Sequence, residues 1–364
     1  MDLTWEQHAA TVERLLGHSV EEPVDLGGSS RTVVWRVRAG GASYVVKVHR
    51  EEEAAGYARE CSALEVLTGT GTVPALVGHD DASRTIVMED LGAGEHLAHA
   101  LLGDAAPVAR RRLHGWVDAL AALHAAATPA RVGAFADAVA RRGASAVADI
   151  EEQPGTAAER YAEVLPELGV DGLDAVLAAL RQVPDLFSDE LVISPGDVCP
   201  DNNAEVGERV VLLDLEGAQL LHPAWDLAYL TVPWPSCWCS WAMPGAEVDA
   251  AVARYAAATR AGTERRRVLG EELAVTTLVW SVVSPGWFLP RALDPAPDES
   301  ARPEVPGRRA MVMHRLALAA AATPPRPLAV LPDFAGRLHA ALERRWGDVR
   351  LPLGPVWRGT TLAP

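Results

Sequence analysis

The sequence contains few cysteines. There are four in 364 residues, at positions 61, 199, 237 and 239. So few cysteines in a chain of this length do not form the disulfide framework of a small secreted domain. Cys237 and Cys239 are also too close together for the usual zinc-ligand spacing, and no second pair lies nearby. We therefore expect all four to be reduced thiols that pack in the interior.

Positive charge is also scarce. The chain has 33 Lys and Arg residues against 49 Asp and Glu residues, a net charge of −16. Binding to nucleic acid depends on basic side chains that displace counterions, so we expect no nucleic-acid partner. Acidity at this level serves solubility, and it is also compatible with a cleft that attracts cationic small molecules.

Long uninterrupted apolar runs are missing as well. No stretch of 18 apolar residues is free of charge and proline, and the first residues, 1–6, have neither the basic start nor the apolar core of a signal peptide. We expect a cytoplasmic protein with no membrane partner, either a monomer or a homodimer. With 49% hydrophobic residues and 364 positions, the chain is long enough for two domains around a cleft.

The most informative segment that is present lies at 195–202 and reads Pro-Gly-Asp-Val-Cys-Pro-Asp-Asn. It is followed by an apolar run, 210–216, that contains Asp214. Asp197, Asn202 and Asp214 thus supply three oxygen-bearing side chains, two from a polar loop and one from a strand end. Such a set can orient a hydroxyl group and bind Mg²⁺, which prefers a few protein oxygens together with substrate phosphates.

This pattern resembles the catalytic segment of the aminoglycoside phosphotransferase family, the small-molecule relatives of protein kinases. Gly196, Asp197 and Asn202 match the family's His-Gly-Asp, four residues, Asn motif, although Pro195 replaces the His. The resemblance implies that Asp197 is the catalytic base and that Asn202 and Asp214 bind the metal. Asp226, in a segment similar to the family's Asp-Leu-Ala, is expected to support the catalytic loop.

The N-terminal part contains candidates for the groups that hold the nucleotide phosphates. Gly28, Ser29 and Ser30 form a small-residue turn between two β-like runs, which lets backbone N–H groups approach phosphate. Lys47 follows in a β-branched run. By resemblance, Lys47 contacts the phosphates and a helical Glu holds it; Glu60 fits the family pattern better than the alternative, Glu65.

A strand at 85–92 changes from apolar residues to acidic residues and glycine. The resemblance implies that this is the hinge between two lobes, with Met88 beside the purine and the backbone of Glu89 to Leu91 bonded to it. The sequence does not distinguish ATP from GTP. An ordinary strand leaving a small sheet is the alternative interpretation.

The predicted fold is α+β and bilobal, similar to a protein kinase. Residues 1–92, with the hinge near 88–92, form a β-rich nucleotide-binding lobe. Residues 93–364 form a mainly helical lobe with the catalytic loop 195–202, the metal-binding strand 210–216 and substrate-facing helices. The stripe from Leu113 to Leu123, at spacings of three and four residues, predicts a core helix at 108–127.

A tryptophan-rich segment, 231–244, follows the metal-binding strand. Its prolines disfavour regular structure, so Trp234, Trp238 and Trp241 could form one wall of an acceptor pocket by stacking or cation–π contact. Glu216 is a further candidate for acceptor contact. Packing of these tryptophans in the core is the alternative.

Together these features predict a Mg²⁺-dependent enzyme that transfers the γ-phosphate of ATP or GTP to a hydroxyl group of a small molecule. We expect an antibiotic acceptor of aminoglycoside, peptide or nucleoside type, possessing positive charge or amphipathic character, and hence a role in resistance. Two alternatives stay open. One is a metabolite kinase acting on a sugar, an amino alcohol or homoserine, and the other is a nucleotide-binding pseudokinase that serves as an interaction module.

Overall fold

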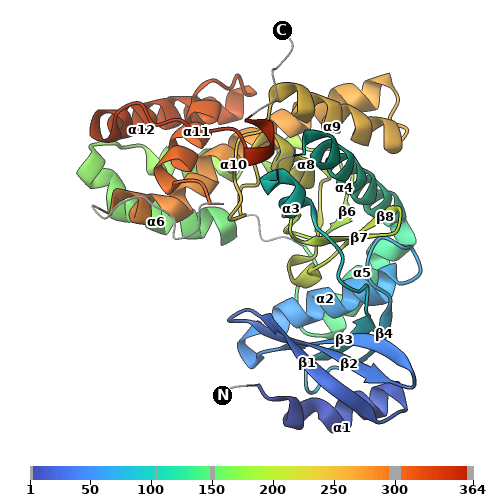
Figure 1. Cartoon of the computed structure of the whole chain (residues 1–364). Coiled ribbons are helices and arrows are strands. Elements are labelled where there is room, and N and C mark those ends of the chain that lie inside the picture. Colours follow the sequence, from blue (N-terminus) through green and yellow to red (C-terminus); the bar gives the residue numbers. More distant parts are fainter. Residues whose placement is uncertain (1–2, 104, 148–151, 295–304, 359–364) are drawn as a thin grey trace.

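The computed structural model describes residues 3–103, 105–147, 152–294 and 305–358 (Figure 1). The N-terminal part is a five-stranded antiparallel sheet with the strand order β1-β2-β3-β5-β4. Its elements are α1 (Trp5–Leu16), β1 (Val20–Gly28), β2 (Thr32–Ala39), β3 (Ala42–His49), α2 (Ala54–Leu67), β4 (Leu76–Asp80) and β5 (Thr85–Glu89).

The two faces of this sheet have different partners. Val46 and Val48 of β3 pack with Trp35 and Val37 of β2 in a small core that also contains Val12 of α1. Because successive side chains of a strand point to opposite faces, the residue between the two valines points away from this core, toward α2. The alternation along β3 therefore points the side chain of Lys47 toward the face of the sheet on which α2 lies.

The C-terminal part is mainly helical, and short two-stranded ladders, β6 with β9 and β7 with β8, carry the functional loops. Its helices are α3 (Leu97–Leu102), α4 (Ala106–Ala126), α5 (Pro129–Arg141), α6 (Glu152–Leu168), α7 (Leu173–Leu180), α8 (Ala224–Thr231), α9 (Gly245–Ala258), α10 (Thr263–Leu293), α11 (Arg308–Ala320) and α12 (Val330–Trp346). Its strands are β6 (Val192–Ser194), β7 (Asn203–Val206), β8 (Arg209–Leu212) and β9 (Gln219–Leu221). The described residues also form the 3₁₀ turns η1 (Glu51–Glu53), η2 (Pro184–Leu186), η3 (Leu215–Gly217), η4 (Arg326–Leu328) and η5 (Pro355–Trp357).

The helices enclose two hydrophobic cores. The predicted stripe of α4 is buried, from Leu113 through Trp116 to Leu123, and packs in the larger core with the site-bearing segments. A second core lies between α6, α10, α11 and α12, which form a separate group at the left of Figure 1. The predicted mixed fold, an antiparallel sheet followed by a helical part, is thus confirmed.

Helix α10 is long and apolar enough to meet a length-and-hydropathy test for a membrane span. However, 72% of its most apolar 18-residue window is buried inside the protein. The helix also continues through Pro285 and Pro290, although a proline inside a helix removes a backbone hydrogen bond. Burial between α6, α8 and α11 explains both observations, because packing against neighbours outweighs the cost of the missing backbone donors.

Candidate functional site

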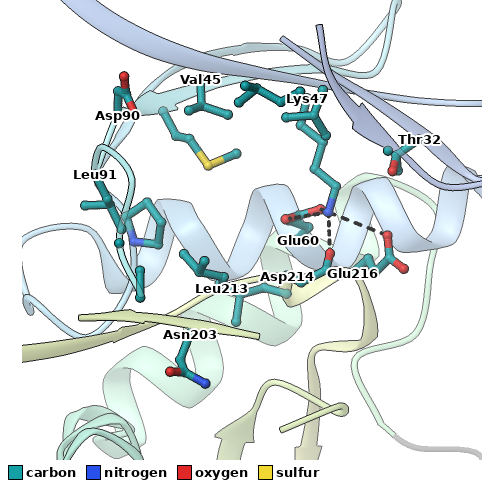
Figure 2. Close-up of a pocket in the computed structure, with 18 of the residues that line it drawn as sticks. Thr32, Val45, Lys47, Glu60, Asp90, Leu91, Asn203, Leu213, Asp214 and Glu216 are labelled. Carbon is teal, nitrogen blue, oxygen red and sulfur yellow. Dashed lines mark hydrogen bonds and ion pairs between the residues drawn. The ribbon is translucent and has the colours of Figure 1, made fainter. Parts of the chain in front are cut away.

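A cavity of about 450 Å³ lies between the N-terminal sheet and the loops of the C-terminal part. Figure 2 shows that its two ends differ. Val45 and Leu91 lie at one end, which is mainly apolar, with Asp90 beside them and Leu213 below them. Met88, the register partner of Val45, also lines the cavity. Lys47 and the carboxylates of Glu60, Asp214 and Glu216 meet at the other end. An elongated cavity with one apolar end and one ionic end suits a nucleotide, with a flat base and a charged phosphate chain.

The turn between β1 and β2 covers the ionic end. Gly28 has φ +148°, and a Cβ at this position would lie 2.3 Å from the carbonyl oxygen of Thr32, so only glycine fits there. The turn is closed by a hydrogen bond from Ser29 N to Thr32 O of 3.0 Å. Gly28 and Ser29 line the cavity, whereas Ser30 is not among its described lining residues.

Lys47 is the only lysine in the sequence, and it lies at the centre of the ionic end. Its Nζ lies 2.8 Å from Glu60 Oε2, 2.5 Å from Asp214 Oδ1 and 3.6 Å from Glu216 Oε2. The structure therefore pairs Lys47 with Glu60, while Glu65 of the same helix pairs with Arg142 on the outside. The side chain is 9% exposed, so these carboxylates compensate a charge that is almost fully withdrawn from water.

Electrostatics keeps this cluster ionised. Burial alone would raise the pKa of Glu60, but the charge of Lys47 and a hydrogen bond with His49 Nε2 outweigh it and hold the pKa at about 2. Burial also opposes the charge of Lys47, yet Glu60 and Asp214 raise the pKa of its amine well above the usual range. The sequence did not indicate His49, because its role depends on the hydrogen bond with Glu60, which lies on α2.

The predicted hinge residues lie at the apolar end of the cavity. Met88, Glu89 and Leu91 all line it. Glu89 N donates to the carbonyl oxygen of Ala75, and Glu89 Oε2 accepts from Ala75 N. The Glu89 N–H is therefore engaged within the protein, which leaves Leu91 as the stronger candidate for a backbone contact to a base.

Asp197 lies on the loop after β6. It is not among the described residues that line the cavity, but the charge of Asp214 acts on its carboxylate. Its Oδ1 accepts hydrogen bonds from Ser236 Oγ at 2.9 Å and from the hydroxyl of Tyr229 at 3.3 Å. Burial raises the pKa of Asp197, and these two hydrogen bonds act in the opposite direction. A carboxylate with a raised pKa in a cleft is suited to accept a proton from a hydroxyl group.

The loop that carries Asp197 is tied to the one that carries Asp214 through their backbones. Gly196 has φ +79°, and a Cβ there would lie 2.0 Å from the carbonyl oxygen of Gly217, so no other residue fits. Asp214 itself has φ 60°, a left-handed conformation that Asp tolerates better than most residues. This conformation ends the run of β8 and directs the carboxylate toward Lys47.

Asp226 supports the catalytic loop, as the sequence suggested. Its Oδ1 accepts from Ser194 Oγ at 2.7 Å, and Ser194 Oγ in turn accepts from Gly196 N at 2.9 Å. The other oxygen of Asp226 lies 2.9 Å from His124 Nε2. This buried polar network holds the backbone of the catalytic loop at Gly196. Pro195 has no side-chain donor that could contribute to it.

The donor set fits a magnesium ion. Asp214 and Asn202 offer a carboxylate and an amide, and Asn202 Nδ2 donates to the carbonyl oxygen of Asp197, so its amide is already oriented beside the catalytic loop. Glu216 adds a carboxylate that also pairs with Arg31 at 2.6 Å. Hard oxygen ligands with a net negative charge are the kind that Mg²⁺ prefers.

The three tryptophans of 231–244 do not act together. Trp234 is 1% exposed and meets Trp116 in the core, and Trp241 is 9% exposed with Arg358 over its ring. The structure therefore assigns these two to packing. Trp238 alone lines a second cavity, of about 260 Å³, and its indole N–H donates to Asp201 Oδ2 at 2.6 Å.

This second cavity adjoins Asp197 through Ser236, which lines the cavity and donates to the carboxylate of Asp197. Trp238, Phe288 and Met311 supply apolar surface. Arg291 and Arg308 supply positive charge, and no acidic side chain is among the described residues that line the cavity.

The expectation that all four cysteines are free is wrong. Cys199 of the catalytic loop and Cys237 of the tryptophan-rich segment form a disulfide bond, while Cys61 and Cys239 are free and buried. The two bonded residues are 38 positions apart. No local pattern shows that the loop after β6 and the loop after α8 meet at their cysteines, and the contacts of Ser236 and Tyr229 were missed for the same reason.

Comparison with known proteins agrees with this geometry. The model of the phosphotransferase enzyme family matches residues 22–269. A search of curated sequences returns no match. The choline kinase LicA from Streptococcus pneumoniae has a similar fold, with a TM-score of 0.56 at 17% identity over 87% of this chain and 98% of that chain.

Two further structures show the same fold. An ethanolamine kinase from Plasmodium vivax has a TM-score of 0.53 at 12% identity and covers 89% of this chain and 81% of its own. The streptomycin–ATP–APH(2")-IIa complex has a TM-score of 0.52 at 14% identity over 79% of this chain and 91% of that chain. The family match spans more than half of the sequence, and the cavity, the lysine pair and the catalytic loop lie within it. The chain belongs to the phosphotransferase enzyme family.

Proposed function

We propose that this phosphotransferase moves the γ-phosphate of ATP or GTP to a hydroxyl group of a small molecule in a Mg²⁺-dependent reaction. The observation that carries the proposal is the position of Lys47 Nζ, bonded to both Glu60 and Asp214 at the ionic end of the cavity. One buried cation held between two carboxylates, beside a further carboxylate on the catalytic loop, is an arrangement suited to phosphoryl transfer.

Each residue then has a separate part. Lys47, held by Glu60, neutralises charge on the phosphates, and the turn at Gly28 and Ser29 covers them. Asn202 and Asp214 hold Mg²⁺, which when bound offsets the negative charge of the phosphates. Asp197 orients the acceptor hydroxyl and accepts its proton. Catalysis by positioning and charge needs no covalent intermediate.

For the acceptor, the second cavity supports a refinement of the expectation from the sequence. Its apolar wall, with Trp238 and Phe288, suits a flat or apolar group, and Arg291 on its rim disfavours a polycation. We therefore favour a hydroxylated antibiotic of peptide or nucleoside type over an aminoglycoside. A metabolite acceptor is the alternative. The cytoplasmic location and the choice between monomer and homodimer stay predictions.

A screen tests this function directly. Hydroxylated antibiotics and metabolites, both cationic and neutral, are incubated with Mg²⁺ and ATP or GTP, and products are detected by the mass gain of one phosphate group. We expect a phosphorylated product from the wild type. Asp197→Asn should lower its rate by about a thousandfold or more with little change in nucleotide affinity.

The matched control is Trp238→Phe, which retains an aromatic wall but cannot donate to Asp201. It should leave nucleotide affinity intact and change only the KM of the acceptor. Nucleotide binding without any product, and without slow hydrolysis, would favour the pseudokinase alternative. Turnover by Asp197→Asn near that of the wild type would exclude the proposed base.

A further inference from the structure

The two hydroxyl groups that bind Asp197 form a closed arrangement. Ser236 Oγ and the Tyr229 hydroxyl each donate to the same oxygen, Oδ1, and they lie 2.9 Å from each other. A carboxylate bound through one oxygen cannot rotate freely, and its second oxygen, Oδ2, keeps a fixed direction. Tyr229 belongs to α8 and is 2% exposed, so one of the two donors is set by the core.

Ser236 needs a different anchor, because it is exposed and lies in an irregular segment. Two contacts hold the segment. Cys237, the next residue, is bonded to Cys199 of the catalytic loop. Ser240 Oγ donates to the carbonyl oxygens of Trp234 and Cys237, which closes the turn around Ser236. The segment that provides the donor is thus covalently joined to the loop that carries the acceptor.

Position 195 makes this support important. Pro195 has no side-chain donor, and the network of Asp226 holds the loop through Ser194 and the backbone of Gly196 without reaching the carboxylate. The orientation of Asp197 therefore depends on groups from outside the catalytic loop. Small displacements of a reacting group, of about 1 Å, can cost about a hundredfold in rate.

We propose that Ser236, fixed by the Cys199–Cys237 bond and assisted by Tyr229, is a positioning residue that orients Asp197 so that Oδ2 faces the acceptor hydroxyl. The inference rests on the proposed role of Asp197 as the base. Reduction of the bond should release Ser236 and lower turnover, because the exposed segment then loses its covalent tie to the catalytic loop.

The first experiment compares Ser236→Ala with Ser236→Thr, which retains the hydroxyl, and with Tyr229→Phe. The measured reaction is hydrolysis of Mg²⁺-ATP with water as the acceptor. Ser236→Ala should lower kcat about 10- to 100-fold and leave the KM for ATP within about twofold, whereas Ser236→Thr should stay within about threefold of the wild type. Equal activity of the Ala and Thr variants would overturn the proposal.

The second experiment tests the bond. Dithiothreitol reduces the disulfide to two thiols and is itself oxidised to its cyclic disulfide, and the double variant Cys199→Ser/Cys237→Ser gives the same state without reagent. Either change should lower kcat as Ser236→Ala does and add little to that variant, since all three release one contact. Full activity after reduction, or free thiols at both positions in the mapped native protein, would refute the role of the bond.

A third measurement separates failure of this inference from failure of the proposed function. Amide hydrogen exchange of peptides covering 195–203 and 232–243 needs no turnover. Exchange of both segments should rise in Ser236→Ala and after reduction, but not in Ser236→Thr. If the wild type neither hydrolyses ATP or GTP nor phosphorylates any compound of the screen, the proposed function fails, and this readout still decides the positioning role: unchanged exchange in Ser236→Ala would overturn it.

Discussion

Lys47 Nζ lies 2.5 Å from Asp214 Oδ1, across 167 positions of sequence. This contact joins the N-terminal sheet directly to the loop after β8 (Figure 2). Because Lys47 also bonds Glu60, one ammonium group links β3, α2 and the candidate metal loop. A change of charge at Lys47, Glu60 or Asp214 therefore alters the electrostatic environment of the other two residues.

The pair of Lys47 and Glu60 should behave as one unit. Lys47→Met and Glu60→Gln should each lower turnover by about a hundredfold, because each removes the same positioned charge from the phosphates. The double variant should lose little more than either single one. Steady-state rates of the three variants test this, with Glu65→Gln as the matched control that should stay close to the wild type. Multiplicative losses would show that Glu60 does not act through Lys47.

A labelling experiment can use the single lysine of the sequence. The raised pKa of Lys47, caused mainly by Glu60 and Asp214 against the effect of burial, keeps its amine protonated and poorly nucleophilic. An N-hydroxysuccinimide ester at pH 8 should therefore acylate only the N-terminal amine of the native protein, and a second amine should react after unfolding in urea. Mass spectrometry of the intact protein measures the number of labels on each molecule.

The control for this labelling is Lys47→Arg, which should take up a single label in both states. Two labels on the native wild type, acquired at similar rates, would contradict the buried ion cluster.

The two proposed metal ligands, Asp214 and Asn202, should contribute unequally to Mg²⁺-dependent ATP binding. Asp214→Asn removes a carboxylate and should weaken Mg²⁺-dependent ATP binding by about 30-fold or more, whereas Asn202→Ala removes a neutral amide and should weaken it by about fivefold. Calorimetric titration with and without Mg²⁺ measures both effects. Binding in EDTA should change far less in either variant, and identical Mg²⁺ dependence in all three proteins would exclude this ligand set.

Stability should fall in mild acid because two histidines, the buried His222 and the half-buried His314, have lowered pKa values. Ala224 N donates to His222 Nδ1, so the ring must be neutral, and burial lowers the pKa of His222 to about 4. Burial and Arg315 lower that of His314 to about 4. The unfolded chain protonates these rings near pH 6.5. Between those values the unfolded state binds more protons, so the free energy of unfolding decreases as the pH falls from about 6.5 toward 4.

The expected loss at pH 5 is roughly 1–2 kcal/mol from each histidine. Thermal unfolding at pH 7.5 and at pH 5.0 measures it. His222→Asn can still accept from Ala224 but cannot be protonated, so its unfolding temperature should depend less on pH than that of the wild type. An equal pH dependence in both proteins would rule out His222 as a source of the acid sensitivity.

The sequence predicted what depends on local pattern. The β-branched run around Lys47, the helical spacing around Glu60 and the spacing of Asp197, Asn202 and Asp214 each reflect short stretches of chain. Alternation along β3 then explains why a lysine between buried valines points into the cleft. The support that Asp226 gives to the catalytic loop was expected in the same way, from the short segment that contains it.

What the sequence did not predict depends on distant segments meeting. The bond between Cys199 and Cys237 and the hydrogen bonds to Asp197 require the loop after α8 to return to the catalytic loop. Trp234 and Trp241 look no different from Trp238 in sequence, yet they are buried in the core, whereas Trp238 lines the second cavity. Helix α10 continues through its prolines because neighbouring helices bury it. Local helix propensity does not include this stabilisation by tertiary packing.

The absence of any side chain between Gly196 and Gly217 has a further consequence. Two backbones in van der Waals contact leave no adjustable spacer, so the separation between the proposed base and the candidate metal loop is set by peptide geometry rather than by side-chain choice. Residues that line the second cavity without bonding the catalytic loop, such as Phe288, can then be exchanged without moving the proposed reacting groups. Specificity for the acceptor can therefore change while the proposed reacting groups keep their positions. The walls of the second cavity are thus the place to engineer a new acceptor.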